Sequence, residues 1–288
     1  MQHKISFAEF IIEDKYDSSR TSKLTREQFV ELIKNNCSDN IRTMIKSKKG
    51  VWRGSWKEKG MYALMDSSRA TEKRTAANVR NYSNLILSNS KTWEKFPKRD
   101  ESFICSSAFS YAKKYARSDP HLVIPFDGTV IGECPADDIF ESFHNVPYQE
   151  VPQFYKYVGY DVGIDFDEYD WNKFVEQNAL LDRYLTSGEY KSKAESIEEA
   201  LGGYFRFGEG DADDFLRRCK KNGILATIDR EMNPFTNGFN LTKDISLLKS
   251  NHEVWFSGKA VAVANASVSQ HPFAMLEVFA EEAGIDYK

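Results

Sequence analysis

Short apolar segments recur along this chain, and helical segments of very different lengths separate them. Runs such as Val51–Arg53, Ser102–Ser106 and Leu122–Phe126 have the length and composition of strands. Strand and helix do not alternate regularly, as they would in a doubly wound parallel sheet. The sequence therefore predicts an α+β fold with a mixed or antiparallel sheet. No GxGxxG or Walker A sequence supports a familiar nucleotide-binding fold.

The N-terminal region, residues 1–49, is predicted to be helical. Residues 5–13 have an amphipathic pattern, and Thr25 and Gln28 have the spacing of a capping box. The apolar residues that follow predict one helix, or two with a break near Ser38-Asp39. A basic last turn before Gly50 predicts the end of this region. The apolar residues at helical spacing are Phe29, Ile33, Cys37, Ile41 and Ile45.

Residues 136–223 are predicted to form a helical insertion within a single domain that spans residues 1–288. Asp127-Gly128 lies between two apolar runs, as is typical of a β-hairpin. Further elements are expected in the second half of the chain. They are a short helix opened by Asp137-Asp138, helices near 171–185 and 213–223, strands at 224–228, 254–256 and 260–263, and a final helix from Pro272 to Ala283.

Composition indicates which kinds of partner this chain binds and in which compartment it is found. The chain has 288 residues and a net charge of -4, with no long block of one sign, so a nucleic-acid partner is not indicated. Its 4 cysteines are far apart and form no CxxC pair, which favours reduced thiols over a zinc site. No apolar run approaches the ~20 residues of a membrane span. The N-terminus lacks the pattern of a signal peptide. We therefore expect a cytoplasmic protein with no membrane partner.

Arg53 stands inside the apolar run Val-Trp-Arg-Gly at 51–54. Arginine is rarely buried without an anionic partner, and its guanidinium suits phosphate and carboxylate groups. Gly54 allows the backbone to come close to a ligand. Arg53 is therefore a candidate binding residue. The alternative is a structural arginine that stacks between Trp52 and Trp56 and pairs with a carboxylate.

Three short motifs resemble those of the ADP-ribosyltransferase family. Val-Trp-Arg-Gly at 51–54 resembles the arginine motif, and Cys-Ser-Ser at 105–107 resembles the Ser-Thr-Ser strand of that family. Glu253-Val254 resembles its catalytic glutamate motif. The order of the three motifs is that of the arginine–serine–glutamate branch, and the resemblance covers roughly residues 50–134 and 250–265. The N-terminal helices followed by the arginine strand also resemble proteins of tailed bacteriophages.

This resemblance implies an ADP-ribosyltransferase-like mixed or antiparallel β core with N-terminal helices and a helical insertion. It implies a mono-ADP-ribosyltransferase that cleaves NAD as its substrate and modifies a macromolecular acceptor, with a protein preferred. A phage-encoded chain would act in the host cytoplasm or be packaged in the virion. Glu253 would stabilise the oxocarbenium-like transition state, and Arg53 would bind the diphosphate or ribose. Ser106 would orient Glu253. Gly54, Ser107 and an aromatic ring, Tyr111 or Phe109, would complete the NAD site.

The motifs depart from the family pattern at two points. Cys105 stands at the first position of the serine motif, and Ser106 replaces threonine at its second. Asn251 occupies the position where enzymes that modify arginine usually carry Glu or Gln, which counts against an arginine acceptor.

The same residues also have a structural interpretation. Ser106 and Ser107 together are also typical of a strand end and an N-cap, and Glu253 of a solvated strand end. A catalytically silent ADP-ribosyltransferase-like protein of the virion or of an interaction complex is therefore the main alternative. A related NAD-using phosphate transfer on RNA is disfavoured by the net charge.

A few other side chains are weaker candidates. Arg69 and Arg99 have the chemistry to bind phosphate but are more simply solvated, and His252 is a possible general base. No histidine is placed to activate Cys105. The acidic residues between 161 and 170 lack the glycine and glutamate positions of an EF-hand, so they are best interpreted as a solvated loop and helix start.

Overall fold

The computed structural model describes residues 17–54, 60–70, 81–114, 116, 120–143, 155, 159, 163–167, 169–187, 209–264 and 272–288. The helix predicted at 5–13 lies outside these residues. The chain groups into two compact units. The first comprises residues 1–78, 96–142 and 238–288, and the second comprises 79–95 and 143–237, which takes in most of the stretch 136–223.

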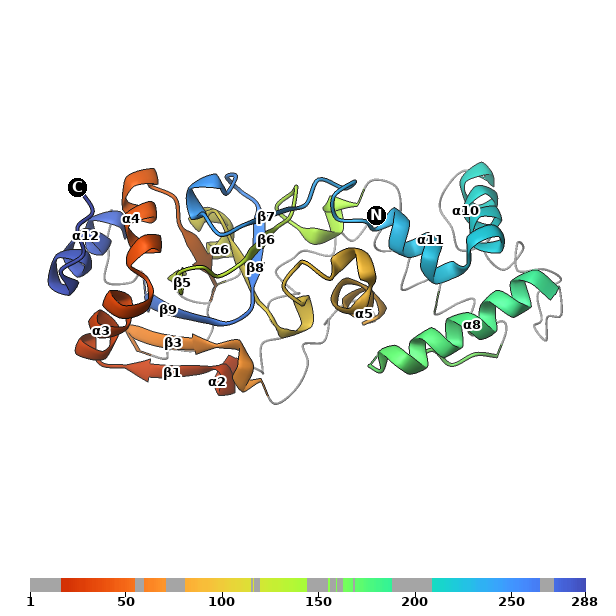
Figure 1. Ribbon diagram of the computed structural model, residues 1–288, viewed down its shortest axis with the longest axis horizontal. Coiled ribbons are helices and arrows are strands. Elements are labelled where there is room, and N and C mark those ends of the chain that lie inside the picture. Colours follow the sequence, from red (N-terminus) through yellow and green to blue (C-terminus); the bar gives the residue numbers. More distant parts are fainter. Residues whose placement is uncertain are drawn as a thin grey trace. The chain divides into compact units, whose positions relative to one another are not determined.

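The first unit is built on one sheet (Figure 1). Within the described residues this sheet has nine strands in the order β1-β3-β9-β5-β2-β4-β8-β6-β7. Every neighbouring pair is antiparallel, so the fold is α+β with an antiparallel sheet. The strands are β1 (Thr21–Leu24), β2 (Val51–Arg53), β3 (Tyr62–Asp66), β4 (Phe103–Ser106), β5 (His121–Pro125), β6 (Ile131–Glu133), β7 (Asn240–Thr242), β8 (Glu253–Phe256) and β9 (Lys259–Ala264).

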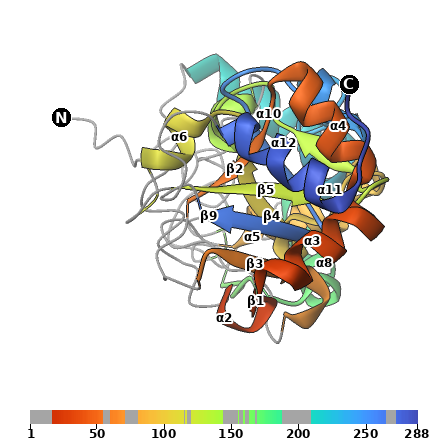
Figure 2. The ribbon, with the colours of Figure 1, turned by 90° about the vertical axis from the view of Figure 1, so that its left-hand side faces the viewer.

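Helices pack against the strands β3, β5 and β9 of this sheet. Figure 2 shows α3 (Arg26–Asn36), α4 (Ser38–Ser47) and α12 (Pro272–Ala283) grouped in front of these strands. The ring of Phe29 on α3 lies 4.8 Å from that of Tyr62 on β3 and 5.0 Å from that of Phe279 on α12. The final helix therefore joins the core with the bounds that the sequence predicts. Short helices α2 (Asp17–Arg20) and α6 (Phe109–Lys114) complete the described helices of this unit.

The N-terminal helical pattern forms two helices, with the break at Cys37. Thr25 caps α3 in a full capping box with Gln28, as predicted. The five apolar side chains at helical spacing are all buried. The predicted glycine closure of α4 is wrong, because Lys48 takes the left-handed conformation (φ 54°) at the C-cap. Gly50 instead leaves room for the Leu122 side chain, since a Cβ at position 50 would lie 2.9 Å from it.

The predicted hairpin at Asp127-Gly128 is also wrong. Strands β5 and β6 both form, but β5 pairs with β2 and β9, whereas β6 pairs with β7 and β8. The Asp127 carboxylate accepts hydrogen bonds from the backbone N–H groups of Asp39 (3.1 Å) and Asn40 (2.9 Å). Asp127 therefore caps the first turn of α4. The predicted tight turn itself forms, with the Thr129 N–H bonded to the Phe126 carbonyl oxygen at 3.1 Å, but it does not join a hairpin.

The second unit is helical in its described part. Its helices are α5 (Tyr82–Asn89), α8 (Trp171–Ser187), α10 (Glu209–Asn222) and α11 (Ile224–Glu231). The predicted strand at 224–228 is wrong, because these residues form α11 and bury Ile224, Thr227 and Ile228. Four aromatic rings pack within this unit, with centroid distances of 4.9 to 6.3 Å: Tyr82, Tyr155, Phe166 and Phe174. In neither unit does a described helix have the length and apolar character to cross a membrane.

Candidate functional site

The three strands that carry the sequence motifs are consecutive neighbours in the sheet. Strand β4 lies between β2 and β8, and pairs with both. Ser106 on β4 is directly opposite Trp52 on β2 and directly opposite Glu253 on β8. The arginine, serine and glutamate motifs, far apart in the sequence, therefore meet at one end of three adjacent strands.

The register nevertheless separates Arg53 from Glu253. Directly opposite residues of paired strands project from the same face, and successive residues project from opposite faces. Trp52, Ser106 and Glu253 therefore share one face. Arg53 follows Trp52 and projects from the other face, together with Cys105. The structure brings Ser106 and Glu253 together and places Arg53 on the far side of the sheet from them.

Arg53 is buried, and its contacts are with the protein. The guanidinium donates a hydrogen bond from Nη1 to the carbonyl oxygen of Ile104 and lies 5.8 Å from the centre of the Phe103 ring. The side chain is 5% exposed. His121, its register partner on β5, has a lowered pKa, first because of burial and second because of the positive charge of Arg53. Arg53 is therefore buried in contacts with β4, and the predicted stack on Trp56 lies outside the described residues.

Glu253 pairs with an arginine, but this arginine is Arg99 and not Arg53. The Arg99 Nη1 donates to Oε1 of Glu253 at 2.5 Å, and the two side chains are 2% and 0% exposed. Burial of an ion pair is tolerated only with close geometry of this kind. The predictions of a solvated Arg99 and a solvated Glu253 are therefore both wrong.

Aromatic rings cover this ion pair. The Arg99 guanidinium lies 5.8 Å from the Trp255 ring, which stacks at 5.9 Å on Phe96. The Trp255 indole donates a hydrogen bond to the carbonyl of Pro97 (2.8 Å). A Cβ at Gly132 would lie 2.6 Å from the same indole, so only glycine fits at this point of β6. These contacts hold Arg99 in place against Glu253.

The serine motif makes backbone contacts on both of its neighbours. The Ser106 hydroxyl accepts the N–H of Ala108 (3.1 Å), immediately before α6. The Ser107 hydroxyl accepts the N–H of His252 (2.9 Å) and also contacts the His252 carbonyl oxygen (3.2 Å). Ser106 therefore binds the backbone directly before α6, and Ser107 joins the end of β4 to the residue before β8.

The remaining predicted NAD contacts lie close to β2 and β4 in the chain. Gly54 is buried directly after β2. Tyr111 lies on α6, where the Lys114 ammonium is 4.2 Å from the centre of its ring. Phe109, the other aromatic candidate, packs edge-on against Trp52 with centroids 5.1 Å apart. Both rings already make contacts within the first unit.

Glu133 on β6 is a further buried carboxylate, which the sequence motifs do not predict. It is 1% exposed and accepts hydrogen bonds from the Lys249 N–H (2.6 Å) and the Asn240 amide (3.4 Å). The Nδ1 of His252 lies 3.5 Å from its Oε1. The register places Glu133 opposite Val254, hence on the Arg53 face. A carboxylate inside the apolar run Ile131–Cys134 was the signal that could have revealed it.

The other candidates have structural surroundings. Arg69 pairs with Asp66 at 3.4 Å while half exposed. The Asp167 carboxylate accepts backbone N–H groups of Tyr169 and Asp170 at the start of α8, as expected of a loop and helix start. All four cysteines are free and buried. No group of three metal-ligating side chains occurs among the residues that the structure describes.

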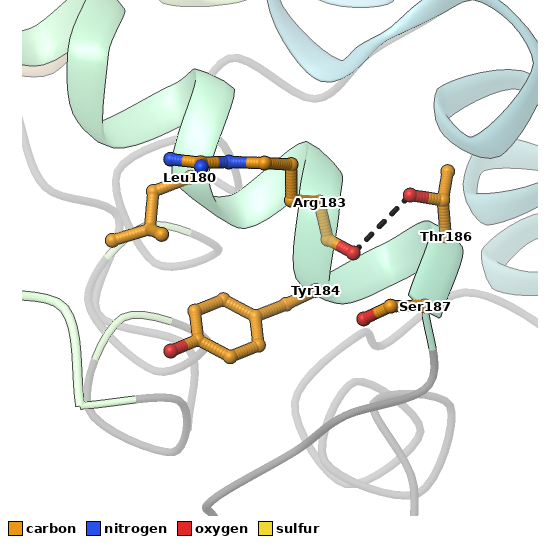
Figure 3. A pocket seen from close by; sticks show the side chains of 5 residues that line it. All are labelled: Leu180, Arg183, Tyr184, Thr186 and Ser187. Carbon is orange, nitrogen blue, oxygen red and sulfur yellow. Dashed lines mark hydrogen bonds between the residues drawn. The ribbon is translucent and has the colours of Figure 1, made fainter.

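A pocket of about 460 Å³ lies along α8 in the second unit (Figure 3). The Thr186 hydroxyl donates to the Arg183 carbonyl oxygen at 3.2 Å, so part of its polar lining is already paired. None of its described lining residues belongs to the three motifs. They are Leu180, Arg183, Tyr184, Thr186 and Ser187.

The chain was compared with known protein families, curated proteins and solved structures. No protein-family model, no curated protein and no solved structure matches this chain.

Proposed function

We propose that this chain has an ADP-ribosyltransferase-like fold, cleaves NAD and transfers ADP-ribose to a macromolecular acceptor, preferably a protein. The order of the strands in the sheet is the main support for this proposal. The strands of the arginine, serine and glutamate motifs are neighbours in the order β2-β4-β8, although the motifs are far apart in sequence. Short motifs that match by chance have no reason to occupy consecutive strands of one sheet.

A second candidate is favoured by the ion pair. Glu253 is fully buried and held by Arg99, and Arg53 projects from the opposite face. In this second candidate Glu253 has a structural role in the sheet and makes no contact with a ribose. These observations favour a catalytically silent ADP-ribosyltransferase-like protein that acts by binding a partner, in a virion or in a host cell if the chain is encoded by a phage.

One experiment separates the two candidates. The full chain is incubated with NAD labelled in the ADP-ribose moiety, with and without bacterial lysate, and both protein labelling and nicotinamide release are measured. The enzyme predicts labelling or release, and loss of both in Glu253→Gln. Because Glu253 is part of a buried ion pair, urea denaturation must first show that the variant is folded. Absence of labelling and of nicotinamide release in the folded wild-type chain selects the silent protein.

A further inference from the structure

His252, directly before β8, has its backbone constrained on both sides. The preceding residue, Asn251, takes the left-handed conformation with φ 63°, which is uncommon for a residue other than glycine. The N–H of His252 donates to the Ser107 hydroxyl at 2.9 Å, and its carbonyl accepts the N–H of Ser107, also at 2.9 Å. These contacts fix the backbone of His252 against the end of β4.

The ring of His252 has one buried nitrogen. Nδ1 is shielded from solvent and makes no hydrogen bond of normal geometry to a described residue, but it lies 3.5 Å from the Glu133 Oε1. The side chain as a whole is 16% exposed. The exposed part of the side chain therefore lies away from Nδ1. Register explains the contact, because His252 is the diagonal neighbour of Glu133 across β8 and β6.

We propose that His252 is a general base that removes the proton from a hydroxyl or water nucleophile, and that Glu133 is the residue that positions it. Both oxygens of Glu133 accept hydrogen bonds, from the Lys249 N–H and the Asn240 amide, so Glu133 favours the tautomer of His252 with the proton on Nδ1. That tautomer leaves a lone pair on Nε2, and a long contact such as the 3.5 Å between Nδ1 and Oε1 is common in catalytic pairs before substrate binds. By strand alternation His252 and Arg53 share a face of the sheet, opposite to the face of Ser106 and Glu253.

The identity of the reaction rests on the proposed function. The oxygen of an acceptor hydroxyl or a water molecule forms a bond to C1′ of the NAD ribose. Nε2 of His252 takes the proton of that oxygen, and the bond from C1′ to nicotinamide breaks with its electron pair on the nicotinamide nitrogen. A positioned general base of this kind contributes about 100-fold or more to a rate.

The base itself is tested without NAD, by acylation with diethyl pyrocarbonate and peptide mass mapping. This reagent transfers its ethoxyformyl group to an unprotonated imidazole nitrogen and releases ethanol and carbon dioxide. We expect His252 to react readily in the folded full chain and several-fold more slowly in Glu133→Gln. The matched control is Glu277→Gln, which removes a surface carboxylate paired with Lys48 and leaves the rate at His252 unchanged. An unreactive His252, or an equal rate in Glu133→Gln, overturns the proposal.

A second arm uses NAD cleavage. His252→Gln is expected to lower kcat about 100-fold with little change in KM, and Glu133→Asp to retain more activity than Glu133→Gln. Unchanged kcat in folded His252→Gln overturns the general base and leaves the transferase proposal standing. A reactive His252 in a chain that never cleaves NAD overturns the transferase instead, and supports the pair as a base for another hydroxyl or water substrate.

Discussion

Arg99 donates from Nη1 to the Oε1 of Glu253 at 2.5 Å, across 154 residues of sequence and with both side chains buried. The sequence motifs predict an arginine near this glutamate, but the arginine that pairs with it comes from the short 3-10 helix η4 (Arg99–Glu101) before β4 and not from β2. The other oxygen of Glu253, Oε2, is buried without a hydrogen bond to any described residue. Arg99 is therefore the contact through which Glu253 is tolerated inside the protein.

Removal of one member of this pair is expected to destabilise the first unit strongly. Glu253→Gln or Arg99→Met leaves an uncompensated buried charge, and such losses cost about 3–5 kcal/mol. The double variant Arg99→Met with Glu253→Leu is expected to recover most of this loss. Urea denaturation measures the free energy of unfolding of each variant. The control is Arg26→Met, which breaks the exposed Arg26–Glu282 pair and should have a far smaller effect. Similar values for Arg26→Met and Arg99→Met contradict the prediction.

Asp127 is expected to stabilise the protein as the cap of α4. Asp127→Ala removes the acceptor for the N–H groups of Asp39 and Asn40, and loss of a cap costs about 1 kcal/mol. Asp127→Asn keeps one acceptor oxygen and should lose less. Urea denaturation of the two variants decides the matter. Equal stability of Asp127→Ala and the wild type contradicts the prediction.

His121 is expected to make stability depend on pH. Burial and the nearby charge of Arg53 lower its pKa in the folded state below the ordinary 6.5. The unfolded chain therefore binds a proton more readily, so the contribution of His121 to stability is complete above about pH 6.5 and is lost progressively as pH falls toward the folded pKa. The unfolding free energy, measured at a series of pH values, should fall less steeply in His121→Gln than in the wild type. Parallel curves for the two proteins count against this assignment.

The cysteines are expected to resist modification in the folded protein. Burial raises the pKa of Cys219 to about 12, and it also raises that of Cys134, where the charge of Glu253 adds to the effect. A thiol in this state carries little reactive thiolate at neutral pH. A thiol-specific disulfide reagent should therefore modify all 4 cysteines in urea and almost none in the native chain. Rapid labelling of the native protein would show that these side chains open to solvent.

Local elements follow from the sequence where the signal itself is local. The capping box at Thr25, the strands at 51–53 and 103–106 and the helix from Pro272 are all formed as predicted. Their causes are hydrogen bonds and side-chain periods within a few residues. The α+β class follows from the same patterns. Asp127-Gly128 forms the predicted turn, but the local signal does not decide which strands pair, and β5 and β6 pair with other strands.

The sequence alone determined that arginine, serine and glutamate strands exist and in which order they occur. Tertiary structure decided which of their side chains meet. A strand has a side-chain period of two, so a register that pairs Trp52 rather than Arg53 with Ser106 turns the arginine to the opposite face from Glu253. Strand pairing likewise brought Glu133 beside His252, and the 3-10 helix before β4 brought Arg99 to Glu253. These contacts join residues far apart in the chain, and no local pattern encodes them.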